Sequence, residues 1–232
     1  KDDNVRKAIA HTVDRNDLTK AGFESHGEDA GTLIPEIVLG SEAADRIKPL
    51  PLNRNEAKKL LDTAGWMPTL ANGMRAKDGR PLVLRLLLSR PDDQAKVAQA
   101  LKAQLAEVGI GMEVQDPGGD TPFTKINNAT FDLFLDVRAQ DDANPCALCR
   151  FFTLRPGGQL SFASSVGGGP KVDDAYDRLF SAPSIDTARR TAAEIMQVVT
   201  VERITAVSIA SLRTEWLISP RVRGFDPAAL PG

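Results

Sequence analysis

The middle of the chain alternates between apolar and polar positions. One face of residues 131–137 carries Phe131, Leu133, Leu135 and Val137, and the other carries Asp132, Phe134 and Asp136. A period of two over this length predicts a β-strand with one strongly buried face. The alternation ends in a polar turn that contains Arg138, Gln140, Asp141, Asp142, Asn144 and Pro145.

Two more strands are predicted upstream of this one. Residues 82–88 (LVLRLLL) form a nearly continuous apolar run, as expected for a strand covered on both faces, and residues 110–114 form the next strand. One helix runs between them from Pro91 to Gly109, and a second near 122–128 precedes the strand at 131–137. This order of strands and helices predicts parallel pairing with right-handed crossovers, and therefore an α/β fold.

Helices are also predicted in the flanking regions. Apolar spacing indicates a helix ending near Thr12, Asp14 caps a helix over 15–23, and Asn53 with Glu56 begins a helix that stops at Gly65. Helices are expected over 172–180 and 186–201, and strands over 206–212 and 214–219. Residues 22–52 and 151–170 are interpreted as loops.

The turn after Val137 is the candidate site. In open sheets with parallel strands, ligands bind beyond the carboxyl ends of the strands, and this turn follows such an end. Its polar side chains are of the kind that binding sites present. A solvated turn with no role is the alternative interpretation of its composition alone.

Composition narrows the range of partners. The chain has 232 residues, of which 42% are hydrophobic and 26% charged, and a net charge of −2. Because the charges are scattered, neither nucleic acid nor an anionic membrane surface is an expected partner. No apolar run approaches the roughly 20 residues that a membrane-spanning helix needs.

No catalytic signature is present. Only two histidines occur, His11 and His26, so a Ser–His or Cys–His nucleophile pair is not expected. Asp136, Asp141 and Asp142 lie close to one turn without an opposing carboxylate, which leaves a hydrolase as the least favoured alternative. We therefore predict a protein that is not an enzyme and has no cofactor.

Cys146 and Cys149 follow the candidate turn as a C-x-x-C motif. A zinc site would need two more ligands of suitable type at a suitable spacing, and none is found, so no metal site is predicted. The favoured interpretation is a pair of structural cysteines, either reduced or linked by a disulfide.

Several segments together resemble family 5 of the extracellular solute-binding proteins, the peptide- and nickel-type receptors of ABC importers. They are VRKAIAHTVDRNDL, NRNEAKKLLDTAGW, DGRPLVLRLLL, QAKVAQALKAQLAEVGIGMEVQ and FDLFLDVRAQDDANP. The segments occur in the family's order, and the resemblance continues through KVDDAYDRLFSA to RVRGF.

This resemblance implies the second lobe of a type 2 periplasmic-binding fold, with a mixed sheet and a βαβαβ core flanked by helices. Residues 1–203 would form this ligand-closing lobe and residues 204–232 would return toward a first lobe outside this sequence. The implied protein is exported, periplasmic or anchored at the cell surface as a lipoprotein. It acts as a monomer that delivers a small-molecule or peptide solute to a membrane permease. A sensor or scaffold with the same fold is the alternative.

The resemblance also assigns roles to the turn. In peptide-binding relatives an aspartate at the position of Asp141 pairs with the amino terminus of the ligand, and Asp142 stands where an aromatic residue is common. The aromatic residue three positions before that aspartate is replaced here by Arg138, which would pair with Asp141 or with an anionic part of the solute. Gln140 and Asn144 complete the predicted ligand-binding set.

Overall fold

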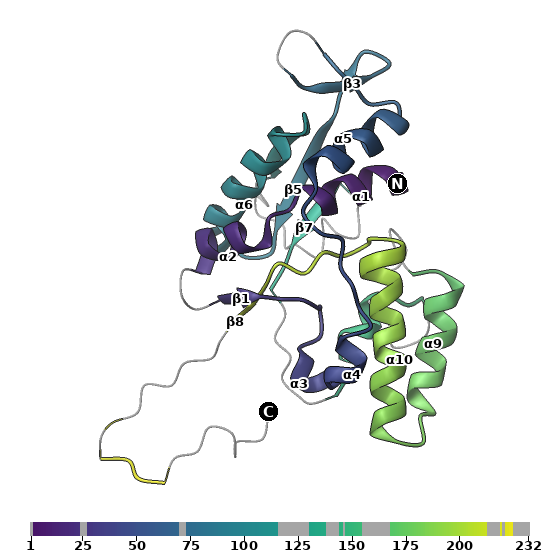
Figure 1. Cartoon of the computed structure of the whole chain (residues 1–232). Coiled ribbons are helices and arrows are strands. Elements are labelled where there is room, and N and C mark those ends of the chain that lie inside the picture. The colour runs from purple at the N-terminus through teal and green to yellow at the C-terminus, as the bar shows by residue number, and fades with distance from the viewer. Residues whose placement is uncertain are drawn as a thin grey trace.

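The computed structural model describes residues 2–23, 27–69, 73–115, 130–137, 144–145, 147–154, 168–212, 219 and 221–224. Its centre is a three-stranded sheet in which β5 (Val83–Leu88) lies between β6 (Gly111–Gln115) and β7 (Leu133–Leu135) and is parallel to both (Figure 1). The predicted parallel pairing of the three strands is confirmed. β7 is shorter than the predicted strand over 131–137, and the helix predicted near 122–128 lies outside the described residues.

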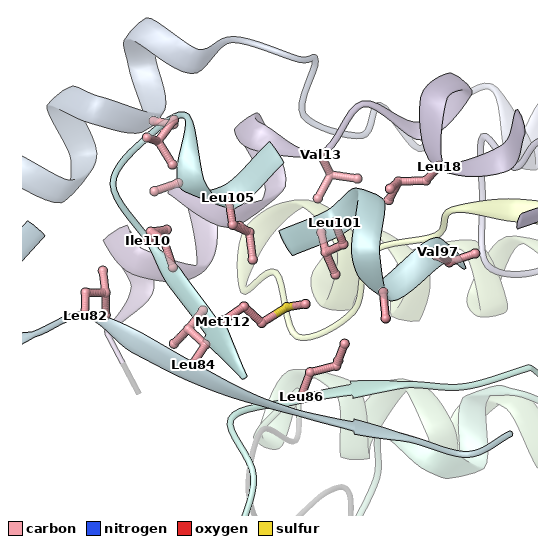
Figure 2. Close-up of a cluster of buried hydrophobic side chains, with 14 of the residues drawn as sticks. Val13, Leu18, Leu82, Leu84, Leu86, Val97, Leu101, Leu105, Ile110 and Met112 are labelled. Atoms are coloured by element: carbon pink, nitrogen blue, oxygen red, sulfur yellow. The ribbon is translucent and has the colours of Figure 1, made fainter. Parts of the chain in front are cut away.

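Helices cover this sheet and form the first core with it. α6 (Pro91–Ala106) connects β5 to β6, and α1 (Asp3–Thr12), α2 (Arg15–Phe23) and α5 (Arg54–Thr63) pack around them. Figure 2 shows Leu101 and Leu105 of α6 pointing toward Leu84 and Leu86 of β5 and Met112 of β6. These side chains are buried, which is why the apolar spacing in these segments was a reliable guide.

The predicted helix ends are confirmed by their hydrogen bonds. The Asp14 side chain accepts a hydrogen bond from the Asp17 N–H (3.1 Å), and the Asn53 side chain accepts one from the Glu56 N–H (3.0 Å). Gly65 and Gly109, which follow α5 and α6, have φ angles of +82° and +84°, a conformation that favours glycine.

A second core lies apart from the central sheet. It is formed by α3 (Glu36–Leu39), α4 (Ser41–Ala44), α9 (Pro170–Phe180) and α10 (Ile185–Gln197), together with a 3₁₀ turn, η1 (Cys149–Phe151). α10 ends four residues earlier than the predicted helix over 186–201 and continues as a π-helical turn, η2 (Val198–Glu202).

Two small antiparallel ladders complete the described structure. β1 (Gly27–Asp29) pairs with β8 (Ala210–Leu212), and β3 (Arg75–Lys77) pairs with both β2 (Met67–Pro68) and β4 (Arg80–Pro81). The interpretation of residues 22–52 as a loop was incomplete, because they contain β1, α3 and α4. In the part of the chain that is described, no helix is long and apolar enough to cross a membrane.

An ion pair fixes the start of β7 against β5. The Arg85 guanidinium donates to both carboxylate oxygens of Asp132 (2.9 and 3.2 Å), and the Arg85 N–H also donates to Asp132 (2.9 Å). Burial raises the pKa of the Asp132 carboxyl, but these hydrogen bonds and the guanidinium charge outweigh it, and the net pKa is lowered. The two strands are thereby held in register at the end of the sheet opposite the candidate site.

Replacing Asp132 by asparagine is expected to lower the free energy of unfolding by up to about 1 kcal/mol at pH 7, because both partners are partly exposed. Because the pKa of Asp132 is lower in the folded state, the ion pair contributes its full stabilisation above the pKa of the unfolded state, about 3.9. This stabilisation is lost as the pH falls through the pKa of the folded state. Urea unfolding from pH 7 to pH 3 should therefore show the difference between the two proteins shrinking below about pH 4. The exposed Asp45, replaced by asparagine, is the control, and an equal effect of both substitutions would contradict the role of the pair.

Candidate functional site

The carboxyl ends of the three parallel strands meet at one edge of the sheet. The register places Leu87 of β5 beside Gln115, the last residue of β6, and Leu88 beside Leu135, the last residue of β7. Polar residues at or just after these ends form what we call the carboxyl edge: Ser89, Arg90, Gln115 and Asp136. The candidate turn leaves the sheet from this edge.

Gln94 organises the turn between β5 and α6. Its side chain is 1% exposed; the amide oxygen accepts a hydrogen bond from the Arg90 N–H (2.9 Å), and the amide nitrogen donates to the Ser89 hydroxyl (3.1 Å). The Ser89 N–H in turn donates to the Leu135 carbonyl of β7 (3.0 Å). The β5–α6 turn is therefore held to β7 at the point where the candidate turn begins.

Arg90 gives the carboxyl edge a positive charge. It is exposed, it is the N-cap residue of α6, and it forms no ion pair with any described residue. The amino terminus of a helix carries a partial positive charge of its own, although Asp92 and Asp93 in the first turn of α6 offset part of it. An anionic group of a ligand is the partner that such an arginine favours.

Gln115 supplies a polar group at the end of β6. Its amide nitrogen donates to the Thr130 carbonyl (3.1 Å), which fixes the side chain. Its amide oxygen is buried and has no hydrogen-bond partner among the residues described. Leaving a buried acceptor without a hydrogen bond costs free energy. The Gln115 amide oxygen is therefore placed to accept a hydrogen bond from an N–H or O–H group of a ligand or from a water molecule.

Of the five predicted ligand-binding residues, the structure describes only Asn144. It is exposed, and its carbonyl accepts a hydrogen bond from the Ala147 N–H (3.1 Å). Arg138, Gln140, Asp141 and Asp142 lie outside the described residues, so the arrangement of the set stays a prediction. Asp136 is described: one carboxylate oxygen accepts a hydrogen bond from the Val137 N–H (2.9 Å).

Sequence reasoning missed the other polar groups of the carboxyl edge. Ser89 and Arg90 follow the last apolar residue of β5, and Gln115 follows the strand predicted over 110–114. The rule that singled out the turn after Val137 applies to all three strands, and it would have found these residues as well. Gln94 gave no such signal, because its burial depends on how α6 packs against the sheet.

The described histidine and the described cysteine each contact a backbone carbonyl. The His11 Nδ1 lies 2.8 Å from the Pro51 carbonyl, which can only accept, so Nδ1 carries the proton and holds the segment before α5. Cys149 is buried in the second core, its thiol 3.3 Å from the Pro145 carbonyl, which agrees with a structural role; Cys146 lies outside the described residues. Within the described ranges, no group of three potential ligands is placed to hold a metal ion.

The sequence and the fold both match known proteins. Residues 1–158 match the family model described as "Bacterial extracellular solute-binding proteins, family 5 Middle". The oligopeptide-binding protein OppA of Mycobacterium bovis is 26% identical over 204 residues, which are 87% of this chain and 34% of OppA. The chain thus spans about a third of the length of this relative.

Two solved structures show the same fold. NikA from Brucella suis, in complex with Fe(III)-EDTA, has a TM-score of 0.72 at 21% identity and aligns over 91% of this chain and 42% of its own. AppA from Bacillus subtilis, in complex with a nonapeptide, has a TM-score of 0.69 at 19% identity and aligns over 90% of this chain and 41% of its own. The predicted fold class, the α/β fold of type 2 periplasmic-binding proteins, is confirmed by this likeness.

Proposed function

Because the chain belongs to the bacterial extracellular solute-binding proteins of family 5, we propose that it forms one lobe of a receptor that closes over an extracytoplasmic solute. In the whole protein this lobe would act in an exported monomer that delivers the solute to an ABC permease. No catalytic step belongs to this proposal. The observation that carries it is the carboxyl edge, where fixed polar groups end all three parallel strands of a chain that matches this family over residues 1–158.

A peptide is the solute that we propose first. Asp141, with Arg138, Gln140, Asp142 and Asn144, would bind the amino-terminal end, and the carboxylate of Asp141 would form a charge-assisted hydrogen bond to the ammonium group. Arg90, exposed and unpaired among the described residues, would attract a carboxylate of the same solute. The names of OppA and AppA as oligopeptide-binding proteins support this choice.

An anionic metal chelate is the second candidate. NikA, which has the same fold, was solved with Fe(III)-EDTA, a complex of net negative charge. Two arginines favour such a solute here: Arg90 at the carboxyl edge and Arg138, which replaces an aromatic residue of peptide-binding relatives. Both solutes carry a negative charge that an arginine of the protein would bind. Only the peptide also carries an ammonium group, which would need a carboxylate such as that of Asp141.

A thermal-shift screen of the full-length protein distinguishes these candidates. Pools of short peptides, Fe(III) and Ni(II) chelates, and small sugars are each added in excess. A ligand present at a hundred times its dissociation constant stabilises the folded form by about 2.7 kcal/mol, which is readily seen as a rise in melting temperature. A rise with peptides alone is expected, a rise with chelates alone would favour the second candidate, and no rise with any pool would contradict a transport role and favour a sensor or scaffold.

A further inference from the structure

The buried apolar side chains form two cores that share no residue. The first core joins α1, α2, α5 and α6 to the central sheet, and the second joins α3, α4, α9 and α10. Figure 1 shows the two groups of elements one below the other. Among the described residues, three segments connect them: 30–35 between β1 and α3, 45–53 between α4 and α5, and 203–209 between η2 and β8. We call the two groups the sheet body and the helical body.

The junction between the bodies is lined by both polar and apolar side chains. A small crevice there is lined by Arg15 of the sheet body, Thr200 of the helical body, and Thr32, Leu50 and Ser208 of the connecting segments. The Arg15 Nε is buried and has no hydrogen-bond partner in the described part of the chain. The Ser208 hydroxyl donates to the Thr32 carbonyl (3.1 Å), so two connecting segments bond to each other. A small gap in the packing therefore lies where the two bodies meet.

Ile204 lies at the start of the third connecting segment in a strained conformation. Its φ angle is +48°, which is unusual for a β-branched residue, and it is 4% exposed although it belongs to neither core. The Thr205 N–H donates to the Val199 carbonyl (2.7 Å), so Ile204 occupies the left-handed position that ends a helix and is usually a glycine. Strain of this kind persists only where the surrounding structure imposes it.

The sheet body holds this segment at both ends. At its far end the Thr19 hydroxyl of α2 donates to the Ile209 carbonyl (3.4 Å), and Val207 and Ile209 pack against the first core. The Arg6 Nε of α1 donates to the Arg203 carbonyl, directly before Ile204 (2.8 Å). The bond joins the first helix of the sheet body to the end of η2 in the helical body. Because residues 207–209 are attached to the sheet body, a rotation between the two bodies would occur at residues 203–206, and it would break the Arg6–Arg203 hydrogen bond.

We propose that the sheet body and the helical body rotate relative to each other about residues 203–206, with Ile204 as the pivot and Arg6 as the tether. Such a motion takes place inside this chain and is distinct from the closure of two lobes on a solute. Relief of the left-handed conformation at Ile204 favours the rotated arrangement, and the Arg6–Arg203 hydrogen bond favours the observed one. Two packed bodies joined by a few residues that absorb a change in φ and ψ are the usual construction of a hinge.

Pulsed electron–electron double resonance on the full chain tests this motion. Spin labels are attached through non-canonical residues at Lys102 of α6 and Arg190 of α10, which are exposed and lie on different bodies. The reference pair is Lys58 of α5 and Lys102, both on the sheet body. We expect the distance distribution of the pair that spans the junction to be clearly wider than that of the reference pair.

The tether is tested in the same labelled proteins. Arg6→Leu should widen the distribution of the spanning pair further and leave the reference pair unchanged. Arg54→Leu, which breaks the surface ion pair between Arg54 and Glu107 inside the sheet body, is the matched control and should change neither distribution. Equal widths for the spanning and reference pairs in the unsubstituted chain would overturn the pivot, and an unchanged width in Arg6→Leu would overturn the tether.

Discussion

Replacing Arg75 by leucine is expected to lower the free energy of unfolding by about 2–5 kcal/mol, because it leaves two backbone carbonyls without a donor. Arg75 is 5% exposed and lies on β3. Its Nε donates to the Val108 carbonyl (2.9 Å), and one terminal nitrogen donates to the Trp66 carbonyl (2.6 Å) and to the Asp62 carboxylate. This one side chain therefore joins the end of α5, the β2–β4 ladder and the end of α6.

Urea unfolding of the Arg75→Leu chain measures this loss, and Arg54→Leu is its matched control. Arg54 also pairs with a carboxylate, that of Glu107, but its side chain is 31% exposed and Glu107 is 51% exposed. Water can replace the lost partner there, so a decrease of no more than about 1 kcal/mol is expected. Equal losses in the two variants would show that burial of the Arg75 network does not set its contribution.

The parts of the fold that could be predicted from the sequence are those in which local pattern and final environment agree. β5 could be predicted because the apolar run in the sequence includes side chains that the folded strand buries, among them Leu84, Leu86 and Leu88. The side chains of Asp14 and Asn53 predicted helix starts because a cap needs only a nearby N–H group.

Elements that depend on distant contacts were missed. α3 and α4 are single turns, too short for an apolar period to show. The Val38 carbonyl of α3 accepts a hydrogen bond from Arg189 of α10 (3.0 Å), a contact across 151 positions that no local pattern reveals. Residues 22–52 were therefore interpreted as a loop because the helices that they contain are short and are held by distant contacts.

The candidate site was predicted in the same uneven way. The turn after Val137 was singled out because a strand with one strongly buried face was predicted to end there, whereas Leu133 and Leu135 of β7 are only partly buried. The same rule applied to β5 would have found Ser89, but it would not have found Gln94, because the role of Gln94 depends on its hydrogen bonds to Ser89 and Arg90 in the folded β5–α6 turn. The sequence thus predicts a place for the site, which stays a prediction, whereas the groups of the carboxyl edge follow from the pairing of the strands.

Replacing Asp141 by asparagine is expected to weaken the binding of a peptide with a free amino terminus by about 10- to 150-fold. This range corresponds to the roughly 1.5–3 kcal/mol of a hydrogen bond to a charged group. The substitution keeps the size of the side chain and removes its charge. Asp45→Asn is the matched control, because it removes the same charge at an exposed position outside the predicted binding set, and no loss is expected for it.

Calorimetric titration of the full-length protein with one peptide and its N-acetylated form tests the central claim most directly. Acetylation removes the ammonium group. If Asp141 binds that group, acetylation should weaken binding about 10- to 150-fold in the unsubstituted protein and have little effect in Asp141→Asn. An equal loss on acetylation in both proteins, or tight binding of the acetylated peptide to the unsubstituted protein, would contradict the account.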